Sequence, residues 1–229
     1  MVTIAVAVTT APRRIPTLGP SLASLRRAGY GDPVVVVADG APPFQLDPRC
    51  ALVRTPGPIG MVAAWALALE TLLAADPDVA LICQDDVTWP DASWPDAVRG
   101  VAALSRHDPS FGYGSFYTGP RVAGALRISS TPAALAAWYP TGHLQPYLFK
   151  HRWSGALGYA VSRPAARALL QDPEFQSCRS TQWRGFDHLV TASLNRLGYA
   201  TYTWSPSLLS HGLGAGNRSQ RQRPVARRP

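Results

Sequence analysis

The sequence predicts an α/β fold in which a mostly parallel central sheet is flanked by helices. Unbroken apolar runs, as at 33–38 and 79–83, are typical of strands buried on both faces. Segments with helical spacing of apolar residues lie between such runs, and this β-α-β order implies right-handed crossovers within a parallel sheet. Polar residues follow the runs, so several polar side chains should meet at one sheet edge, where open α/β sheets bind ligands.

The first half of the chain supports this order element by element. Strands are predicted at 2–8, 33–38, 51–54 and 79–87, and helices at 17–28, 61–75 and 94–105. The first helix has Leu18, Leu22 and Leu25 at helical spacing and Gly29 as its stop signal. Gly60, at the entrance of the second helix, would let a backbone approach a phosphate, although glycine there is commonly simple turn chemistry.

The second half is less regular. Strands are predicted at 112–117, 153–161 and 199–204, with one helix at 163–170 and another that opens at 184–188 and runs through 197. The intervening residues 118–149 are rich in Pro, Gly and aromatics, which favours a substrate-shaping insertion over a second domain. We therefore expect one domain over residues 1–215, followed by a basic disordered tail at 216–229.

Composition limits the functional classes. The 229 residues are 46% hydrophobic and 16% charged, which are globular values. Three cysteines without a CxxC pair argue for a reduced, cytoplasmic protein without structural zinc or a disulfide framework. No signal peptide is recognisable, and the most apolar helical stretch, 59–75, is short for a membrane span and contains Glu70.

The net charge of +8 is unevenly distributed, because five arginines and no acid lie in 218–229, which leaves about +3 on the rest of the chain. A basic arm attracts nucleic acid through counterion release. The alternative is a tail that only keeps the protein soluble.

The chain is organised around Asp85 and Asp86, which end the apolar run 79–83 after Cys83 and Gln84. Two adjacent carboxylates at a ligand-binding edge are poorly tolerated unless a cation or a ligand dipole shares the site. The alternative is a solvated strand-to-loop junction. Because Thr9 to Arg13 and Asp39 follow two other predicted strands, the cluster has what a nucleotide site requires.

At this point the chain resembles the GT-A-type, family 2-like glycosyltransferases that use nucleotide sugars. The resemblance spans about residues 2–212 and rests on TTAPRR, ADG, GPIGMVAAWALALE and ICQDDV, in that order. It implies a Rossmann-related sandwich whose residues 1–110 bind the nucleotide sugar and whose residues 111–215 bind the acceptor. It also implies a Mn²⁺ or Mg²⁺ ion that bridges the two donor phosphates.

The resemblance assigns roles on the donor side. Asp86 would be the principal metal ligand, and Asp85 would hold the donor ribose or sugar, or a metal-bound water. Thr9 and Arg13, with Thr10 between them, would contact the base and the phosphates, Asp39 the base or ribose, and Gly60 would belong to the donor loop. Two positions depart from the family pattern: Gln84 stands where an acid is common, and Pro58 beside Gly57 replaces a common Gly-Asn pair.

The resemblance assigns acceptor-side roles as well. Asp187 would be the general base of an inverting reaction; alternatively it is a helix N-terminal acid worth about 0.3–1 kcal/mol. His211 would complete the metal shell, or it is an ordinary loop histidine. Trp153 and Gly155 would shape the acceptor pocket, or Trp153 is an ordinary core residue.

Several functions remain open from the sequence alone. The leading hypothesis is a glycosyltransferase with a UDP- or other nucleotide-activated sugar. Its acceptor would be a glycan, a cell-envelope component or a small molecule, or else a hydroxylated base in DNA or RNA. A nucleotidyltransferase would require a glycine-rich loop with lysine after the first strand, and TTAPRR has neither. The last alternative is a non-catalytic nucleic-acid-binding protein.

Overall fold

The computed structural model describes residues 2–41, 44–117, 138–140, 157–179, 186–204 and 207–211. Within these residues eight strands form one sheet in the order β3-β2-β1-β4-β8-β6-β9-β7. The strands are β1 Ile4–Thr10, β2 Val34–Ala38, β3 Cys50–Arg54, β4 Val79–Gln84, β6 Phe111–Ser115, β7 Trp138–Pro140, β8 Gly158–Ser162 and β9 Ala200–Trp204. The described helices are α1 Leu18–Arg27, α2 Met61–Leu73, α3 Trp94–His107, α6 Arg163–Gln171, α7 Pro173–Cys178 and α8 Phe186–Arg196.

The sheet is mostly parallel, as the sequence predicts. β3, β2, β1 and β4 are parallel neighbours, and β6 is parallel to β9. β8 runs antiparallel between β4 and β6, and β7 runs antiparallel to β9. The antiparallel β8 joins the regular first half to the second half of the chain.

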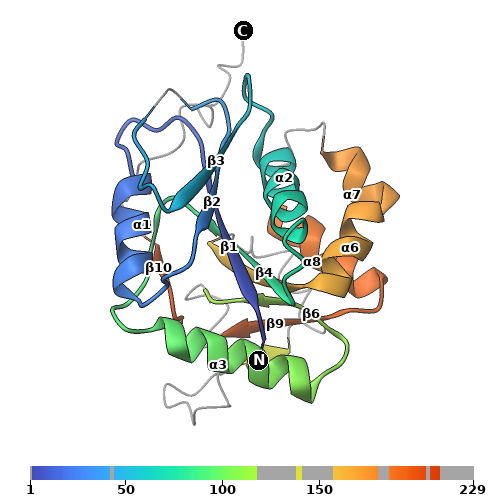
Figure 1. The fold of residues 1–229 in the computed structure, drawn as a ribbon. Helices are drawn as coiled ribbons and strands as arrows, with labels where there is room; N and C mark the ends of the chain where they lie inside the picture. The colour runs from blue at the N-terminus through green and yellow to red at the C-terminus, as the bar shows by residue number, and fades with distance from the viewer. Residues whose placement is uncertain are drawn as a thin grey trace, which may run out of the picture.

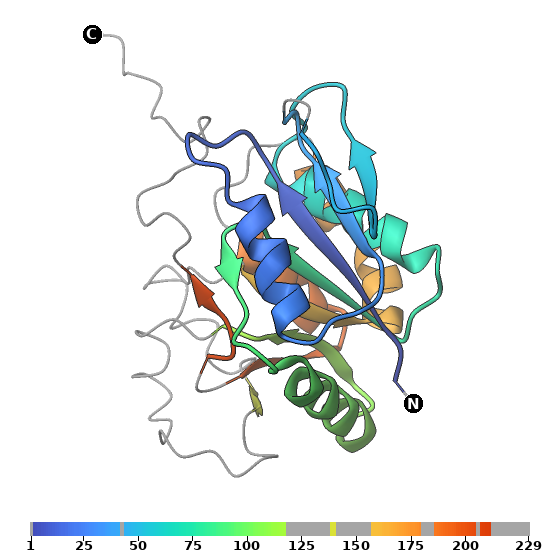
Figure 2. The same cartoon turned by 60° about the vertical axis from the view of Figure 1, so that its left-hand side comes forward.

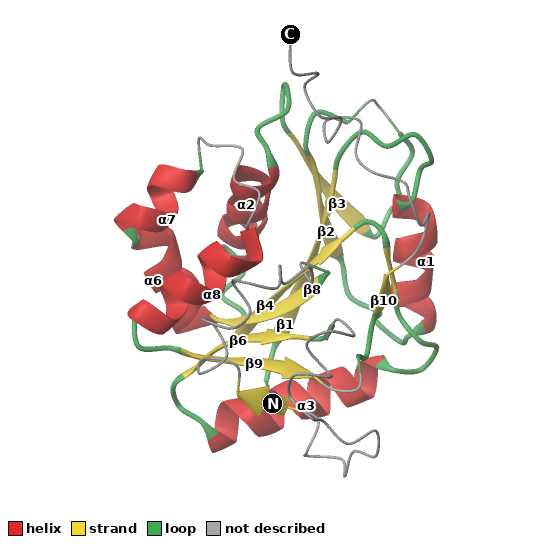
Figure 3. Ribbon diagram, turned by 180° about the vertical axis from the view of Figure 1, so that it is seen from behind, coloured by secondary structure: helices red, strands yellow, loops and turns green. Residues whose placement is uncertain are grey.

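Helices cover both faces of the sheet (Figures 1 and 3). α1 lies on one side, and α2, α6, α7 and α8 lie on the other. Alternate strand residues supply the two faces: Val6 and Val8 belong to the core with α1 and α3, whereas Ala7 belongs to the core with α2, α6 and α8. Because both faces are buried, the strands are apolar runs without alternation.

The polar strand ends meet at one edge, as predicted. The backbone N–H of Asp39 donates to the Thr10 carbonyl at 2.8 Å, and that of Asp85 donates to the Thr9 carbonyl at 3.1 Å. These bonds continue the ladders β2-β1-β4 beyond the strand ends. The ends of three strands are thereby held side by side at the carboxyl edge of the sheet.

A small ribbon beside this edge was not predicted. The expected strand 79–87 ends at Gln84, and after a turn at Asp85 and Asp86 the chain forms β5, Val87–Thr88. β5 pairs antiparallel with β10, Ser210–His211 (Figure 2). Leu209, directly before β10, is buried and packs on Gly158 of β8, where a Cβ atom would come within 2.3 Å of it.

The helix α7 was likewise not predicted from the sequence. Among the described residues, no helix is both long enough and apolar enough to cross a membrane.

Candidate functional site

The two acids at the end of β4 are buried. Asp85 is 2% exposed and Asp86 is 8% exposed, although both lie in a turn. The reading of Asp85 and Asp86 as a solvated junction is therefore wrong for this structure. Buried carboxylates need partners, because desolvation disfavours their charged form.

Arg13, from the loop between β1 and α1, binds both carboxylates. Its Nε and Nη2 lie 2.8 and 2.6 Å from Oδ1 of Asp85, and its Nη1 lies 3.1 Å from Oδ2 of Asp86. The Thr10 hydroxyl donates to the other oxygen of Asp85 at 2.5 Å. Thr10, Arg13, Asp85 and Asp86, which the sequence placed at separate strand ends, thus form one charged cluster.

The cluster shifts the pKa values of Arg13 and Asp85. Burial opposes the charge on Arg13, but the hydrogen bonds and charges of Asp85 and Asp86 outweigh it and raise the pKa of the guanidinium. Burial raises the pKa of Asp85 above its ordinary value, while Arg13 and the Thr10 hydroxyl pull it back. The Arg13 guanidinium is therefore the neighbour that most favours the charged form of Asp85.

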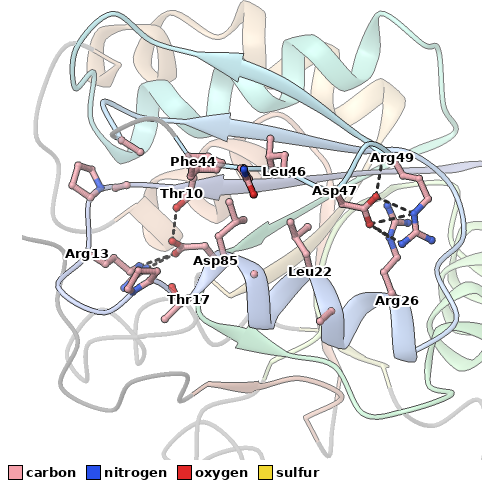
Figure 4. Close-up of a pocket in the computed structure, with 18 of the residues that line it drawn as sticks. Thr10, Arg13, Thr17, Leu22, Arg26, Phe44, Leu46, Asp47, Arg49 and Asp85 are labelled. Atoms are coloured by element: carbon pink, nitrogen blue, oxygen red, sulfur yellow. Dashed lines mark hydrogen bonds and ion pairs between the residues drawn. The ribbon is translucent and has the colours of Figure 1, made fainter.

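A pocket of about 700 Å³ opens from this cluster and runs along α1 (Figure 4). Thr10, Arg13 and Asp85 lie at one end. Apolar side chains line its middle, among them Leu22 of α1 and Phe44 and Leu46 of the loop between β2 and β3. Its size is that of a small-molecule site, and its composition, apolar walls with a few polar groups, is typical of one.

The far end of the pocket carries a second ion cluster. Asp47 accepts hydrogen bonds from Arg49 at 2.7 Å and lies 3.9 Å from Nε of Arg26. The bonds from the Arg49 side chain and backbone lower the pKa of Asp47 to about 2. Sequence reasoning missed these residues, although Arg26 follows Leu18 and Leu22 at steps of four and therefore shares their helix face.

Asp39 and Gly60 are bound to each other. The carboxylate of Asp39 accepts the backbone N–H groups of Ile59 at 2.5 Å and Gly60 at 3.0 Å. Asp39 thereby anchors the loop that opens α2, where the helix dipole favours an anion. Contact of Asp39 or Gly60 with a nucleotide stays a prediction, as does that of Thr9, whose hydroxyl donates to the Cys83 carbonyl at 3.4 Å.

The remaining predicted residues are placed only in part. His211 pairs with Val87 in the β5-β10 ribbon. Val87 directly follows Asp86, so the His211 backbone lies beside the neighbour of Asp86. Asp187 is the second residue of α8. The side chains of both, and all of Trp153 and Gly155, lie outside the described residues.

The donor atoms at this edge suit a divalent cation. Asp85 and Asp86 already hold one cation, the Arg13 guanidinium, and carboxylate oxygens are the ligands that Mg²⁺ and Mn²⁺ prefer. Among the side chains that the structure describes, no three His, Cys, Asp or Glu residues are grouped to hold a metal ion. The metal-ligand role of His211, whose side chain lies outside that set, stays a prediction.

Comparison with known proteins gives likenesses of structure and none of sequence. No protein-family model and no curated protein matches the chain. The chain is similar to the crystal structure of GalNAc-T7 with UDP, GalNAc and Mn²⁺, with a TM-score of 0.61 and 14% identity over 92% of this chain. It is similar to S. aureus TarS, with a TM-score of 0.54 and 14% identity over 89% of this chain.

The chain spans only 43% and 35% of the length of these two proteins. At 14% sequence identity, the similarity to these structures shows the fold alone. The predicted GT-A-like α/β fold is confirmed.

Proposed function

We propose that this chain is a metal-dependent glycosyltransferase that moves a sugar from a nucleoside-diphosphate donor to an acceptor hydroxyl. The observation that carries the proposal is the buried Asp85-Asp86 pair at the carboxyl edge of a GT-A-like sheet, where both acids bind the Arg13 guanidinium. The GalNAc-T7 structure, which contains UDP, GalNAc and Mn²⁺, supports UDP-sugar as the donor and Mn²⁺ as the metal, with Mg²⁺ as the alternative.

The pocket at this edge suits a nucleotide. Its apolar middle, between Leu22 and Phe44, would cover a flat base, while Thr10 and Arg13 at its charged end would contact the diphosphate. A divalent ion held by Asp86, with His211 as a further ligand, would neutralise charge on the leaving diphosphate. Asp85 would hold Arg13 in place and contact the ribose or the sugar.

Asp187 is proposed as the general base that takes the proton of the acceptor hydroxyl. Its neighbour Phe186 packs on Trp65 of α2 with ring centroids 5.2 Å apart, and on Tyr159 of β8 at 6.3 Å. Trp65 lies near the start of α2, which leaves the same sheet edge as Asp39, so α8 also begins toward that edge. A base in this place, with Trp153 and Gly155 shaping the acceptor pocket, would make the reaction inverting.

A hydroxylated base in DNA or RNA is a second candidate acceptor, favoured by the five arginines of residues 218–229. Filter binding at rising salt tests it. Nucleic-acid affinity that falls steeply with salt would support this acceptor, and a flat response would contradict it.

A donor screen tests the activity. UDP-, GDP- and TDP-sugars are each offered with Mn²⁺, and released nucleotide is measured. We expect turnover with one donor class, and a loss of roughly 100-fold or more in Asp86→Asn, because the developing charge on the diphosphate loses its stabilisation. Asp91→Asn is the matched control, since Asp91 is 73% exposed and pairs only at the surface with Arg27. Equal turnover in Asp86→Asn and the wild type would contradict the metal assignment.

A further inference from the structure

The Arg13 guanidinium holds the two acids unequally. Two of its nitrogens bind Asp85 at 2.6 and 2.8 Å, and Thr10 binds the same carboxylate from the other side. The described contact that joins Arg13 to Asp86 is longer, at 3.1 Å. Asp85 is therefore the firm anchor of Arg13, and Asp86 is the carboxylate that Arg13 releases more readily.

The charges make this contact a competitor of metal binding. Among the side chains that the structure describes here, the two buried carboxylates and the guanidinium carry a net charge of −1, so Arg13 offsets much of the charge that a metal would meet. An Oδ2 atom that already binds the guanidinium is a weaker metal ligand, because the two cations repel each other and share its charge. If Arg13 leaves and nothing replaces it, two like charges remain in a site that excludes water, which is strongly unfavourable.

We propose that Arg13 occupies the cation site of the donor-free protein and moves from Asp86 to the donor diphosphate when the donor and a divalent ion bind together. The inference rests on the proposed function. In this exchange Asp86 passes from one cation to another, and Arg13 passes from a carboxylate to a phosphate, whose geometry the guanidinium fork matches. Arg13 lines the pocket, so a diphosphate bound in the pocket would lie close to its guanidinium.

The exchange makes metal and nucleotide binding cooperative. A divalent ion alone must displace Arg13 without offering it a new partner, whereas a bound diphosphate supplies that partner. By linkage each ligand then raises the affinity for the other, by a factor of roughly 5 to 150 for a typical coupling. In this scheme Arg13 binds the diphosphate of the sugar donor and also controls when Asp86 is available to the metal ion.

The test is a titration of the full chain with Mn²⁺ in the absence of nucleotide, with free Mn²⁺ measured by electron paramagnetic resonance. We expect weak binding by the wild type and roughly 10-fold tighter binding by Arg13→Gln, since the competing cation is gone. We expect UDP to strengthen Mn²⁺ binding by the wild type much more than by Arg13→Gln. Asp86→Asn should weaken Mn²⁺ binding with or without Arg13.

The matched control is Arg163→Gln. Arg163 also bridges two acids, Asp76 at 2.5 Å and Asp78 at 3.2 Å, but at the start of β4, the end remote from Asp85. Its loss should leave Mn²⁺ affinity unchanged. Should Arg13→Gln fail to fold, Arg13→Met also removes the charge but keeps an unbranched apolar stem, and we expect it to bind Mn²⁺ more tightly than the wild type.

The outcomes separate the two hypotheses. If Arg13→Gln or Arg13→Met binds Mn²⁺ no more tightly than the wild type while Asp86→Asn binds it less, the exchange is wrong and the metal site stands. If Asp86→Asn changes nothing, both the exchange and the metal assignment of the proposed function are wrong. If the wild type binds Mn²⁺ tightly without UDP, and UDP adds nothing, the exchange is also wrong.

Discussion

Asp172 is a buried carboxylate that joins α7 to α8. It accepts the backbone N–H of Phe175 at 2.9 Å as the N-cap of α7. It also accepts the Arg196 guanidinium of α8 at 2.8 and 2.9 Å. Burial opposes its charge, but the bonds from Arg196 and Phe175 outweigh burial and lower the pKa of Asp172 below 3.8.

We predict that Asp172→Asn lowers the free energy of unfolding by about 1 kcal/mol at neutral pH, because asparagine keeps the cap and loses the ion pair with a half-exposed arginine. A carboxyl whose pKa is lowered in the folded state stabilises the protein above its unfolded value of 3.8. That stabilisation is lost as the pH falls through the folded value. Urea unfolding should therefore show the difference from the wild type shrinking below pH 3.8. A difference that persists unchanged in acid would contradict the ion-pair explanation, and Asp91→Asn serves as the exposed control.

At the residue scale, sequence reasoning identified the charged residues of the site and missed the ion pairs that join them. Asp85, Asp86 and Arg13 were predictable because each lies in the polar segment that follows an apolar run. Their joint ion pair was not, since it joins residues 72 positions apart. Asp39 was assigned to a nucleotide for its place at a strand end, yet its observed partners are amides 20 and 21 residues further along.

At Gly40, the loop after β2 closely approaches the loop that contains Pro58, at the carboxyl edge of the sheet. This residue has a φ of +61°, and a Cβ atom there would lie 2.8 Å from the backbone nitrogen of Pro58. Gly40 also donates its N–H to the Thr55 hydroxyl at 3.0 Å. The backbone conformation and the close approach both require glycine.

We predict that Gly40→Ala lowers the free energy of unfolding by about 1–3 kcal/mol, because it adds strain at positive φ and a clash with a backbone atom. Thermal and urea unfolding measure the change. Gly57→Ala, in the loop that Gly40 contacts, is the control: nothing lies within 4 Å of a Cβ atom there. A variant Gly40→Ala as stable as Gly57→Ala would show that the Pro58 loop gives way freely.

At the element scale, long periodic segments were predictable and short ones were not. The helices α1, α2, α3 and α6 begin within one residue of their predicted starts. α7 has six residues and β10 has two, too few for a periodic pattern to develop. The antiparallel direction of β8 also could not be predicted, because an apolar run has the same pattern in either direction.

At the scale of the whole molecule, the two halves of the chain build one sheet. β4 lies between β1 of the first half and β8 of the second, and β8 pairs with β4 over five residues, from Val79 with Ser162 to Cys83 with Gly158. The core beneath α2 is completed by α6 and α8. We therefore propose that the division at residue 110 separates binding roles and not folding units. We propose that residues 1–215 fold as one domain.

The last prediction follows from this shared sheet. A fragment of residues 1–110 would expose the edge of β4 and the faces of Ala80 and Ile82, which pack with the second half in the intact chain. An open central strand with a bare apolar face favours aggregation over folding. We expect the fragment to lack a cooperative unfolding transition and dispersed amide NMR signals. The intact chain should unfold in one transition, with circular dichroism and tryptophan fluorescence coinciding. A fragment that unfolds cooperatively as a monomer would instead show that the first half is a domain, and that the second half was added to a structure already stable.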